Sequence, residues 1–270
     1  MISRRAVLAG MTALPTVAAC SSRQTSYSAS SSQGGGGYPA RAGLDAVIDI
    51  SHNVRVSDFN LVRRSNILGV IHKATEGGDW FDPSYTSRRR QAEAAGLLWG
   101  SYHFGTRQYS GEQQAAAFLS LTQPGPQTLM ALDLEPNEGN PRNTMRLAQA
   151  EAFVLAIHRA TGRLPIVYTH PKWANGVRYG RANMTLDAPV TSSSVVARCD
   201  LWLADYREQP EVPVAWADRG WRLWQYAADE RESDAAYGTV SRAVKGLDFC
   251  DRNLFAGDAA ALPRFWSGRS

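Results

Sequence analysis

The sequence predicts an α/β protein, an irregular β/α barrel of the TIM type in which about five β/α units precede three further strands. Three observations predict this fold. From Leu44 onward, the chain has the length and the apolar content of one barrel-sized domain. Apolar runs alternate with helical patterns in this part of the chain. Almost every apolar run also ends in a polar residue, as expected where the strand ends of a barrel form one active face.

Eight apolar runs are the strand candidates, and each is short enough to be a single buried strand. In chain order they are residues 46–50, 69–73, 97–102, 129–134, 165–168, 201–204, 222–226 and 246–249.

Helices are expected between the early runs, at residues 57–65, 84–95, 111–121 and 143–161. The second lies between Pro83 and Gly96, which are preferred at the start and the end of a helix. The fourth has Asn143 as its candidate cap and Gly162 at its end, with apolar side chains on one stripe. Beyond the fifth strand candidate the helical pattern weakens, which predicts an irregular second half of the barrel.

Polar and aromatic residues follow nearly all the strand candidates. In a β/α barrel the carboxyl ends of the strands meet at one end, together with the loops that follow them. One acid at a strand end means little, but polar residues at the ends of eight strands predict a ring-shaped site. The residues concerned are Asp49, Ser51, Lys73, Glu76, His103, Asp133, Glu135, Tyr168, Thr169, Asp205, Tyr206, Gln225, Tyr226, Asp248 and Asp251.

Asp133 and Glu135 are the most informative pair in this ring. They follow an apolar run, and side chains two apart on a strand point to the same side. Two carboxylates in one partly dry site cannot both ionise freely, so one tends to stay protonated. Acid-assisted glycoside cleavage needs such an arrangement. The alternative interpretation is a capping Asp beside a solvated Glu at a strand end.

Residues 1–19 have the features of an export signal. Arg4 and Arg5 precede an uncharged apolar run that is too short to span a bilayer stably. The arginine pair resembles a twin-arginine signal, and Val17-Ala18-Ala19-Cys20 resembles a bacterial lipobox. We therefore expect Cys20 to be lipidated as the first residue of the mature chain. The alternative is an ordinary secretory signal with an incidental cysteine.

Domain boundaries and location follow from this start. Residues 20–42 are rich in Ser and Gly and are expected to be a flexible tether. Residues 43–258 are expected to form the barrel and 259–270 a C-terminal tail. Ser21, directly after the lipid-bearing cysteine, resembles the pattern of outer-membrane sorting. The sequence thus predicts an exported protein on the periplasmic side, anchored to a membrane by lipid, with the outer membrane favoured.

Charge and cysteine content limit the partners and cofactors. Without residues 1–19, Lys and Arg fall from 29 to 27 against 25 Asp and Glu, a net charge of about +2. The sequence shows no concentrated basic face, so no nucleic-acid partner is expected. Cys199 and Cys250 either pair in an oxidising periplasm or remain buried thiols. No Cys/His spacing resembles a zinc site, so we expect no metal, no other cofactor, and a monomer.

Short motifs follow one another in order from Leu44 to about Gly257. They are Asp49-Ile50-Ser51-His52, Ile71-His72-Lys73-Ala74-Thr75-Glu76-Gly77, Gly100-Ser101-Tyr102-His103-Phe104, Leu132-Asp133-Leu134-Glu135, Pro165-Ile166-Val167-Tyr168-Thr169, Leu201-Trp202-Leu203-Ala204, Trp224-Gln225-Tyr226 and Asp251-Arg252-Asn253. In this order and spacing they resemble glycoside hydrolase family 25, the Chalaropsis-type lysozymes. The resemblance implies an irregular β/α barrel.

The resemblance also implies an activity, namely hydrolysis of the β-1,4 bond between N-acetylmuramic acid and N-acetylglucosamine in peptidoglycan glycan strands. Glu135 would be the general acid and base, and Asp133 would orient the N-acetyl group of the substrate. Asp49 and Asp251 would complete an acidic floor. The family's first motif usually carries Gln where this chain has Val54, so a substrate-facing amide is expected to be lost.

The route of cleavage is expected to be retaining. An inverting enzyme needs roughly 6.5–9.5 Å between its two carboxyl groups, and Asp133 is too close to Glu135 along the strand to leave obvious room for that water. Assistance by the N-acetyl group of the sugar fits better.

Further strand-end residues are candidates for substrate binding. Aromatic rings there suit the C–H faces of sugars, although a buried Trp is more often a packing residue. His103 either binds substrate or is satisfied by a neighbouring carboxylate, and Lys73 is expected to pair with Glu76. The substrate-binding candidates are His103, Tyr168, Asp205, Tyr206, Trp224, Gln225 and Tyr226.

Three alternative functions remain open. One is a non-catalytic peptidoglycan-binding lipoprotein on the same barrel, which only the Val54 departure favours. A second is a chitinase-like hydrolase, although the longer acidic strand signature of those enzymes is missing. A third is a metal-dependent phosphoesterase, which needs several strand-end histidines where only His103 is available.

Overall fold

The barrel predicted from the sequence is present in a computed structural model that describes residues 43–207, 209–228 and 243–269. Its strands are β1 (Leu44–Ile50), β2 (Gly69–Glu76), β4 (Leu98–Phe104), β5 (Leu129–Asp133), β6 (Ile166–Thr169), β7 (Leu201–Ala204), β8 (Leu223–Ala227) and β9 (Asp251–Phe255). Pairing of β1 with both β2 and β9 closes the ring. The short β3 (Trp80–Phe81) forms a hairpin with β2.

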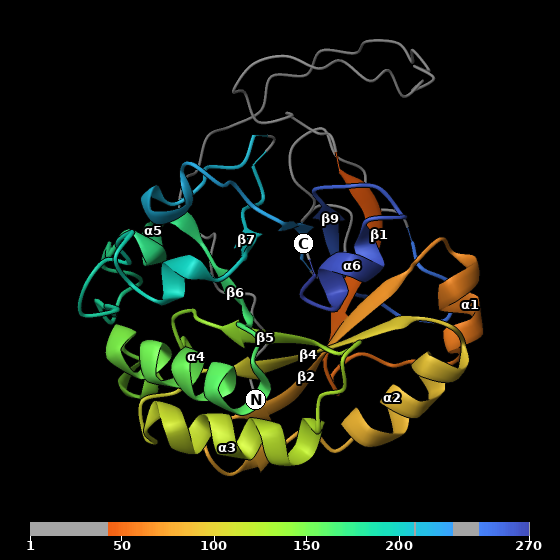
Figure 1. Ribbon diagram of the computed structural model, residues 1–270, viewed down its shortest axis with the longest axis horizontal. Helices are drawn as coiled ribbons and strands as arrows, with labels where there is room; N and C mark the ends of the chain where they lie inside the picture. Colours follow the sequence, from red (N-terminus) through yellow and green to blue (C-terminus); the bar gives the residue numbers. More distant parts are fainter. Residues whose placement is uncertain (1–42, 208, 229–242, 270) are drawn as a thin grey trace.

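Five of the six described helices cover the outside of this ring, and the last one closes one of its ends. They are α1 (Phe59–Arg64), α2 (Tyr85–Ala94), α3 (Gly111–Thr122), α4 (Leu147–Thr161), α5 (Pro171–Ala174) and α6 (Leu262–Trp266). Figure 1 shows α1 to α5 in an arc outside the strands, with α6 inside it. Five β/α units followed by three strands are thus confirmed. Within the described ranges, no helix is long and apolar enough to cross a bilayer.

Most helix ends follow the sequence signals, but the start of α4 does not. Ser110 and Gln113 form a capping box on α3, and Gly162 ends α4 with a left-handed φ of 71°. Asn143 was expected to cap α4, which instead begins at Leu147. The Asn143 side chain accepts hydrogen bonds from the backbone amides of the loop after β4, at 3.1 and 2.9 Å. It therefore joins two loops rather than capping a helix.

The last strand was expected at residues 246–249, and this prediction is wrong. Gly246 has a φ of +97° and lies against the Asp58 carbonyl, so the chain turns there. The strand that closes the barrel is β9, and it runs antiparallel to both β1 and β8. This direction places its first residue, Asp251, opposite Asp49 near the carboxyl end of β1.

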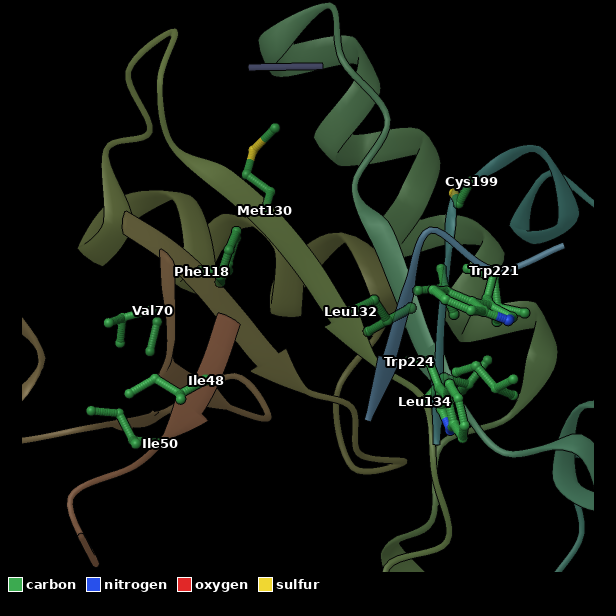
Figure 2. Close-up of a cluster of buried hydrophobic side chains, with 14 of the residues drawn as sticks. Ile48, Ile50, Val70, Phe118, Met130, Leu132, Leu134, Cys199, Trp221 and Trp224 are labelled. Atoms are coloured by element: carbon green, nitrogen blue, oxygen red, sulfur yellow. The ribbon is translucent and has the colours of Figure 1, made fainter. Parts of the chain in front are cut away.

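Alternation along the strands separates two apolar layers. On β1, Val47 belongs to the cluster inside the ring, whereas Ile48 and Ile50 pack against the helices. Figure 2 shows part of the outer layer, which includes Leu132 and Trp224. The inner layer fills the end of the barrel where the parallel strands begin, here called the lower end. The end where they finish, the upper end, is lined by polar side chains.

The segment after residue 258, expected to be a tail, contributes a helix to the core. Trp266 on α6 is fully buried inside the lower end, and its indole N–H donates to the Trp99 carbonyl at 2.8 Å. A Cβ atom on Gly69 would lie 2.6 Å from the Trp266 ring, so the first residue of β2 must stay small. Helix α6 therefore closes the lower end.

Gly111→Ala is expected to destabilise the outer shell, because helices α3 and α4 approach each other most closely at this glycine. A Cβ atom there would lie 2.2 Å from the Gln149 carbonyl oxygen and 2.5 Å from the Phe153 nitrogen. Overpacking of this kind costs about 1–3 kcal/mol. Urea denaturation measures the loss. Gly125→Ala, with nothing nearer than 4.0 Å, is the matched control, and equal stability of the two variants would contradict the packing described.

Candidate active site

Asp49 lies at the centre of the polar upper end. Its side chain is buried, and Oδ2 accepts hydrogen bonds from Gln225 Nε2 and Asn253 Nδ2, both at 2.9 Å. These amides come from β8 and β9, so three strands fix one carboxylate.

Gln225 connects this carboxylate to the rest of the site. Its Oε1 accepts from the hydroxyls of Tyr168 at 2.9 Å and Tyr206 at 2.8 Å. Its Nε2 also approaches Asp251 Oδ2 at 3.4 Å. The amide therefore has its oxygen toward two phenols and its nitrogen toward two carboxylates, an orientation that the hydrogen bonds define.

Asn253 is a site residue that the sequence reasoning did not select. It is fully buried, and its Oδ1 accepts from Trp202 Nε1 at 2.6 Å while its Nδ2 donates to Asp49. The signal that could have identified it is its position two residues after Asp251 on one strand, which places both on the same face.

Asp133 and Glu135 approach this network from β5. Leu129 and Ala131 belong to the inner layer, whereas Leu132 and Leu134 lie in the outer one. The alternation puts Asp133, which is buried, on the inner face at the strand's last residue. Glu135 follows just beyond the strand and is partly exposed.

The Tyr206 hydroxyl lies close to several of the acids. Burial, together with the negative charges of Asp251, Glu135 and Asp49, raises the pKa of its phenol well above the ordinary value. Acids on three strands or strand-end loops thus act on one hydroxyl. The predicted residues that the structure brings together are Asp49, Asp133, Glu135, Tyr168, Tyr206, Gln225 and Asp251.

Asp205 is close to this group, but its carboxylate serves its own loop. It accepts from Arg207 at 2.6 Å and from the Glu211 backbone amide at 2.8 Å. Its backbone carbonyl accepts from Trp224 Nε1 at 2.5 Å. Asp205 was predicted to contact substrate, whereas its contacts in the structure hold the loop after β7.

Three residues that were predicted to bind substrate lie in the outer apolar layer rather than on the inner face of the barrel. Trp224 and Tyr226 flank the inner residue Gln225 on β8 and are therefore on its outer face. Trp224 packs on Trp221, with ring centroids 5.7 Å apart. Both are fully or almost fully buried, so neither offers a surface to a substrate.

His103 is the third residue for which the predicted substrate contact is wrong. It sits on the outer face of β4, where its ring stacks on Phe153 with centroids 4.8 Å apart. Its nitrogens contact Thr75 Oγ1 at 2.8 Å and Gln114 Oε1 at 3.0 Å. The sequence left open a substrate contact or a neighbouring carboxylate, and the partners found are instead a hydroxyl and an amide.

A pH-dependent stability is expected from this burial. Burial lowers the pKa of His103 to about 4, so the unfolded chain binds its proton first as the pH falls below the ordinary value of 6.5. The free energy of unfolding should therefore be fully retained above pH 6.5 and decrease from there toward about pH 4. In His103→Gln the free energy of unfolding should depend less on pH, by an amount that corresponds to at most one bound proton. Urea denaturation at several pH values across the range measures this dependence. His158→Gln, an exposed histidine, is the control, and an equal slope in all three proteins would contradict the assignment.

Other features predicted from the sequence have plain structural roles. Lys73 Nζ contacts Glu76 Oε2 at 2.7 Å, which confirms their pairing. Val54 is buried in the outer apolar layer, so the side chain that departs from the family pattern is a packing residue. Cys199 and Cys250 are both free and buried. The predicted signal, Cys20 and the tether lie outside the described residues.

Comparison with known proteins identifies the family. The profile described as "Glycosyl hydrolases family 25" matches residues 48–235. The chain is 34% identical over 197 residues to N,O-diacetylmuramidase of Chalaropsis sp, covering 66% of this chain and 82% of that protein. It is 28% identical over 231 residues to lysozyme M1 of Streptomyces globisporus, covering 80% and 69% respectively.

Solved structures agree with the architecture. The bacterial lysozyme from Streptomyces coelicolor superposes with a TM-score of 0.67 at 26% identity, covering 85% of this chain and all of that one. The family 25 lysozyme from Aspergillus fumigatus gives 0.63 at 27% identity, covering 83% and 99% respectively. With the barrel, the acids at its upper end and a matching profile over most of the described residues, the chain belongs to glycosyl hydrolase family 25.

Proposed function

We propose that this protein is a peptidoglycan hydrolase, an N-acetylmuramidase that cleaves the β-1,4 bond between N-acetylmuramic acid and N-acetylglucosamine. The observation that carries the proposal is the group of acids at the upper end of a family 25 barrel, where Gln225 contacts Asp49 and Asp251, and Glu135 lies close enough to act on Tyr206. The relatives named lysozyme and N,O-diacetylmuramidase support the same bond.

Within this proposal, Glu135 protonates the leaving glycosidic oxygen. Asp49 and Asp133 are buried, whereas Glu135 and Asp251 are partly exposed, and of these four only Glu135 lies beyond the end of its strand. A proton donor must reach the bond that breaks, and general acid catalysis contributes about 10²- to 10⁴-fold. Asp133 lies two residues before Glu135, on the inner face of β5, and orients the N-acetyl group of the sugar.

Gln225 and Asn253 act as positioning residues. They hold Asp49 from two strands, and Gln225 also engages the hydroxyls of Tyr168 and Tyr206. This arrangement holds the buried carboxylate in place beside the substrate, with both phenols fixed on the amide oxygen of Gln225. Tyr206 is partly exposed and offers its ring to a sugar.

The reaction route is tested by following a muramyl glycan with NMR during the first turnovers. We expect the product to keep the β configuration at the new reducing end, because the N-acetyl group assists from within the substrate. An initially inverted α anomer would contradict this route. Faster turnover of chitin oligomers than of muramyl glycan would instead support the chitinase-like alternative.

The protein is further proposed to work outside the cytoplasm, tethered by a lipid on Cys20 and facing the periplasm, with the outer membrane favoured. The export signal and lipobox pattern in residues 1–20 support this location. A monomer is proposed because one chain carries all the acids of the site. Globomycin treatment of producing cells tests the anchor: the unprocessed precursor should accumulate if Cys20 is the lipidation site.

A further inference from the structure

The lower end of the barrel gathers arginines that are far apart in the sequence. They come from the end of α4, the segments before β6, β7 and β8, helix α6 and the residues just after it. We call this set the basic rim, and its members are Arg159, Arg163, Arg198, Arg219, Arg264 and Arg269. All are exposed except Arg163, which is partly buried. The sequence shows no such concentration because the fold alone brings these segments together.

Most of this charge is not neutralised. None of the six arginines forms an ion pair with another of the residues in the described ranges. Arg163 donates to the carbonyl oxygens of Gly125 and Thr128 at 3.0 and 3.1 Å, and Arg219 donates to that of Cys199 at 3.0 Å. Hydrogen bonds to carbonyl oxygens orient a guanidinium group but do not neutralise its charge. Among the carboxylates at this end, Asp45 and Glu93 pair with Arg252 and Arg89, which are not members of the rim, and the others include Asp200, Asp218 and Asp258.

Two adjoining hollows open among these arginines. One of about 390 Å³ is lined by His158, Arg163, Arg198 and Arg219, with a single carboxylate, Asp200. A larger one of about 910 Å³ shares Arg163 with the first and has a mainly apolar lining from Leu119, Pro124, Pro126 and Ala160. The basic rim thus combines positive charge with small apolar surfaces.

The predicted lipid anchor joins the barrel at this same end. Gly43 precedes β1 at the lower end, where it lies against Trp221, Leu254 and the Phe255 carbonyl. Residues 21–42, which separate it from Cys20, can span at most roughly 75 Å when fully extended. A lipid on Cys20 would keep the basic rim near the bilayer, whereas the acids lie at the opposite end of the strands.

We propose that the basic rim docks on the anionic headgroups of the membrane to which the chain is tethered, so that the upper end faces away from the bilayer. Arginine near an anionic leaflet contributes about fivefold each to binding. The acids of the upper end would be repelled by the same surface, which favours one orientation. This inference rests on the proposed anchor only for the choice of membrane, since the rim itself is read from the barrel.

Vesicle co-sedimentation of the chain from residue 20, carrying Cys20→Ser, tests the rim without the lipid. Binding to phosphatidylglycerol vesicles is expected in low salt, with little binding to phosphatidylcholine and loss of binding in 0.5 M salt. The combined variant Arg198→Gln, Arg264→Gln, Arg269→Gln should bind about 100-fold more weakly. Within the part of the chain that the structure describes, these three side chains donate to no carbonyl, and Arg269 Nε donates to Ser267 Oγ at 3.3 Å, so the fold is expected to survive.

The matched control removes the same charge elsewhere, through Arg90→Gln, Arg142→Gln and Arg181→Gln, all exposed and outside the rim. It should bind vesicles nearly as the parent does, and both variants should keep peptidoglycan hydrolysis, which also reports folding. Equal weakening in the two triple variants would overturn the proposal. So would a rim variant that loses binding to purified sacculi but not to vesicles, since the partner would then be the wall.

Discussion

Glu135→Gln is expected to lower peptidoglycan turnover by about 10³-fold while leaving the protein folded and able to bind its substrate. The amide keeps the size of the side chain but cannot donate the proton that the leaving oxygen needs. Release of reducing ends from purified peptidoglycan measures turnover, and co-sedimentation with sacculi measures binding.

Glu138→Gln is the matched control, because this acid lies three residues further along the same loop. Burial raises its pKa, and its hydrogen-bonded neighbour Tyr179 opposes that shift. The control should keep most of the activity. Turnover by Glu135→Gln within a few-fold of the parent would contradict the assigned role, and absence of turnover in the parent, with retained binding, would favour the binding-protein alternative.

Trp266→Ala is expected to give the largest loss of stability, about 3–5 kcal/mol in the free energy of unfolding. The indole fills the lower end of the barrel between Gly69 and Gly100 and donates to the Trp99 carbonyl. Its removal leaves a cavity that those two glycines are too small to fill, and it removes one hydrogen bond to the Trp99 carbonyl. Urea denaturation followed by circular dichroism measures the effect.

Leu155→Ala provides the comparison on an exposed part of α4, where the side chain is 41% accessible. Apart from the difference in helix propensity between Leu and Ala, the free energy of unfolding should change by no more than about 0.5 kcal/mol. A loss below about 1 kcal/mol for Trp266→Ala would mean that α6 is dispensable. The residues after 258 would then behave as the tail that the sequence predicted.

Much of the upper end could be predicted from the sequence because polar residues interrupt apolar runs at the strand ends. Position at a strand end, however, does not tell whether a side chain lies on the inner or the outer face of the barrel. Tyr226 and Trp224 alternate with Gln225, and His103 follows the inner residue Tyr102, so period-two alternation places all three outside. Treating every strand-end aromatic as a site residue ignored this alternation.

The closing strand was harder to predict for a different reason. Residues 246–249 resemble a strand in composition, but Gly246 turns the chain and β9 begins only at Asp251. Its antiparallel direction reverses which end of the strand carries functional residues. Asp251 and Asn253 therefore reach the site from the start of a strand, where a β/α pattern gives no reason to look.

The central claim is that this barrel cleaves the glycan of peptidoglycan on the muramic acid side, and identification of the new reducing ends tests it most directly. Purified peptidoglycan is digested with the parent chain or with Glu135→Gln, reduced with borohydride and analysed by mass spectrometry. We predict N-acetylmuramitol at the new ends with the parent alone. N-acetylglucosaminitol at those ends would contradict the claim and assign the protein to the opposite bond.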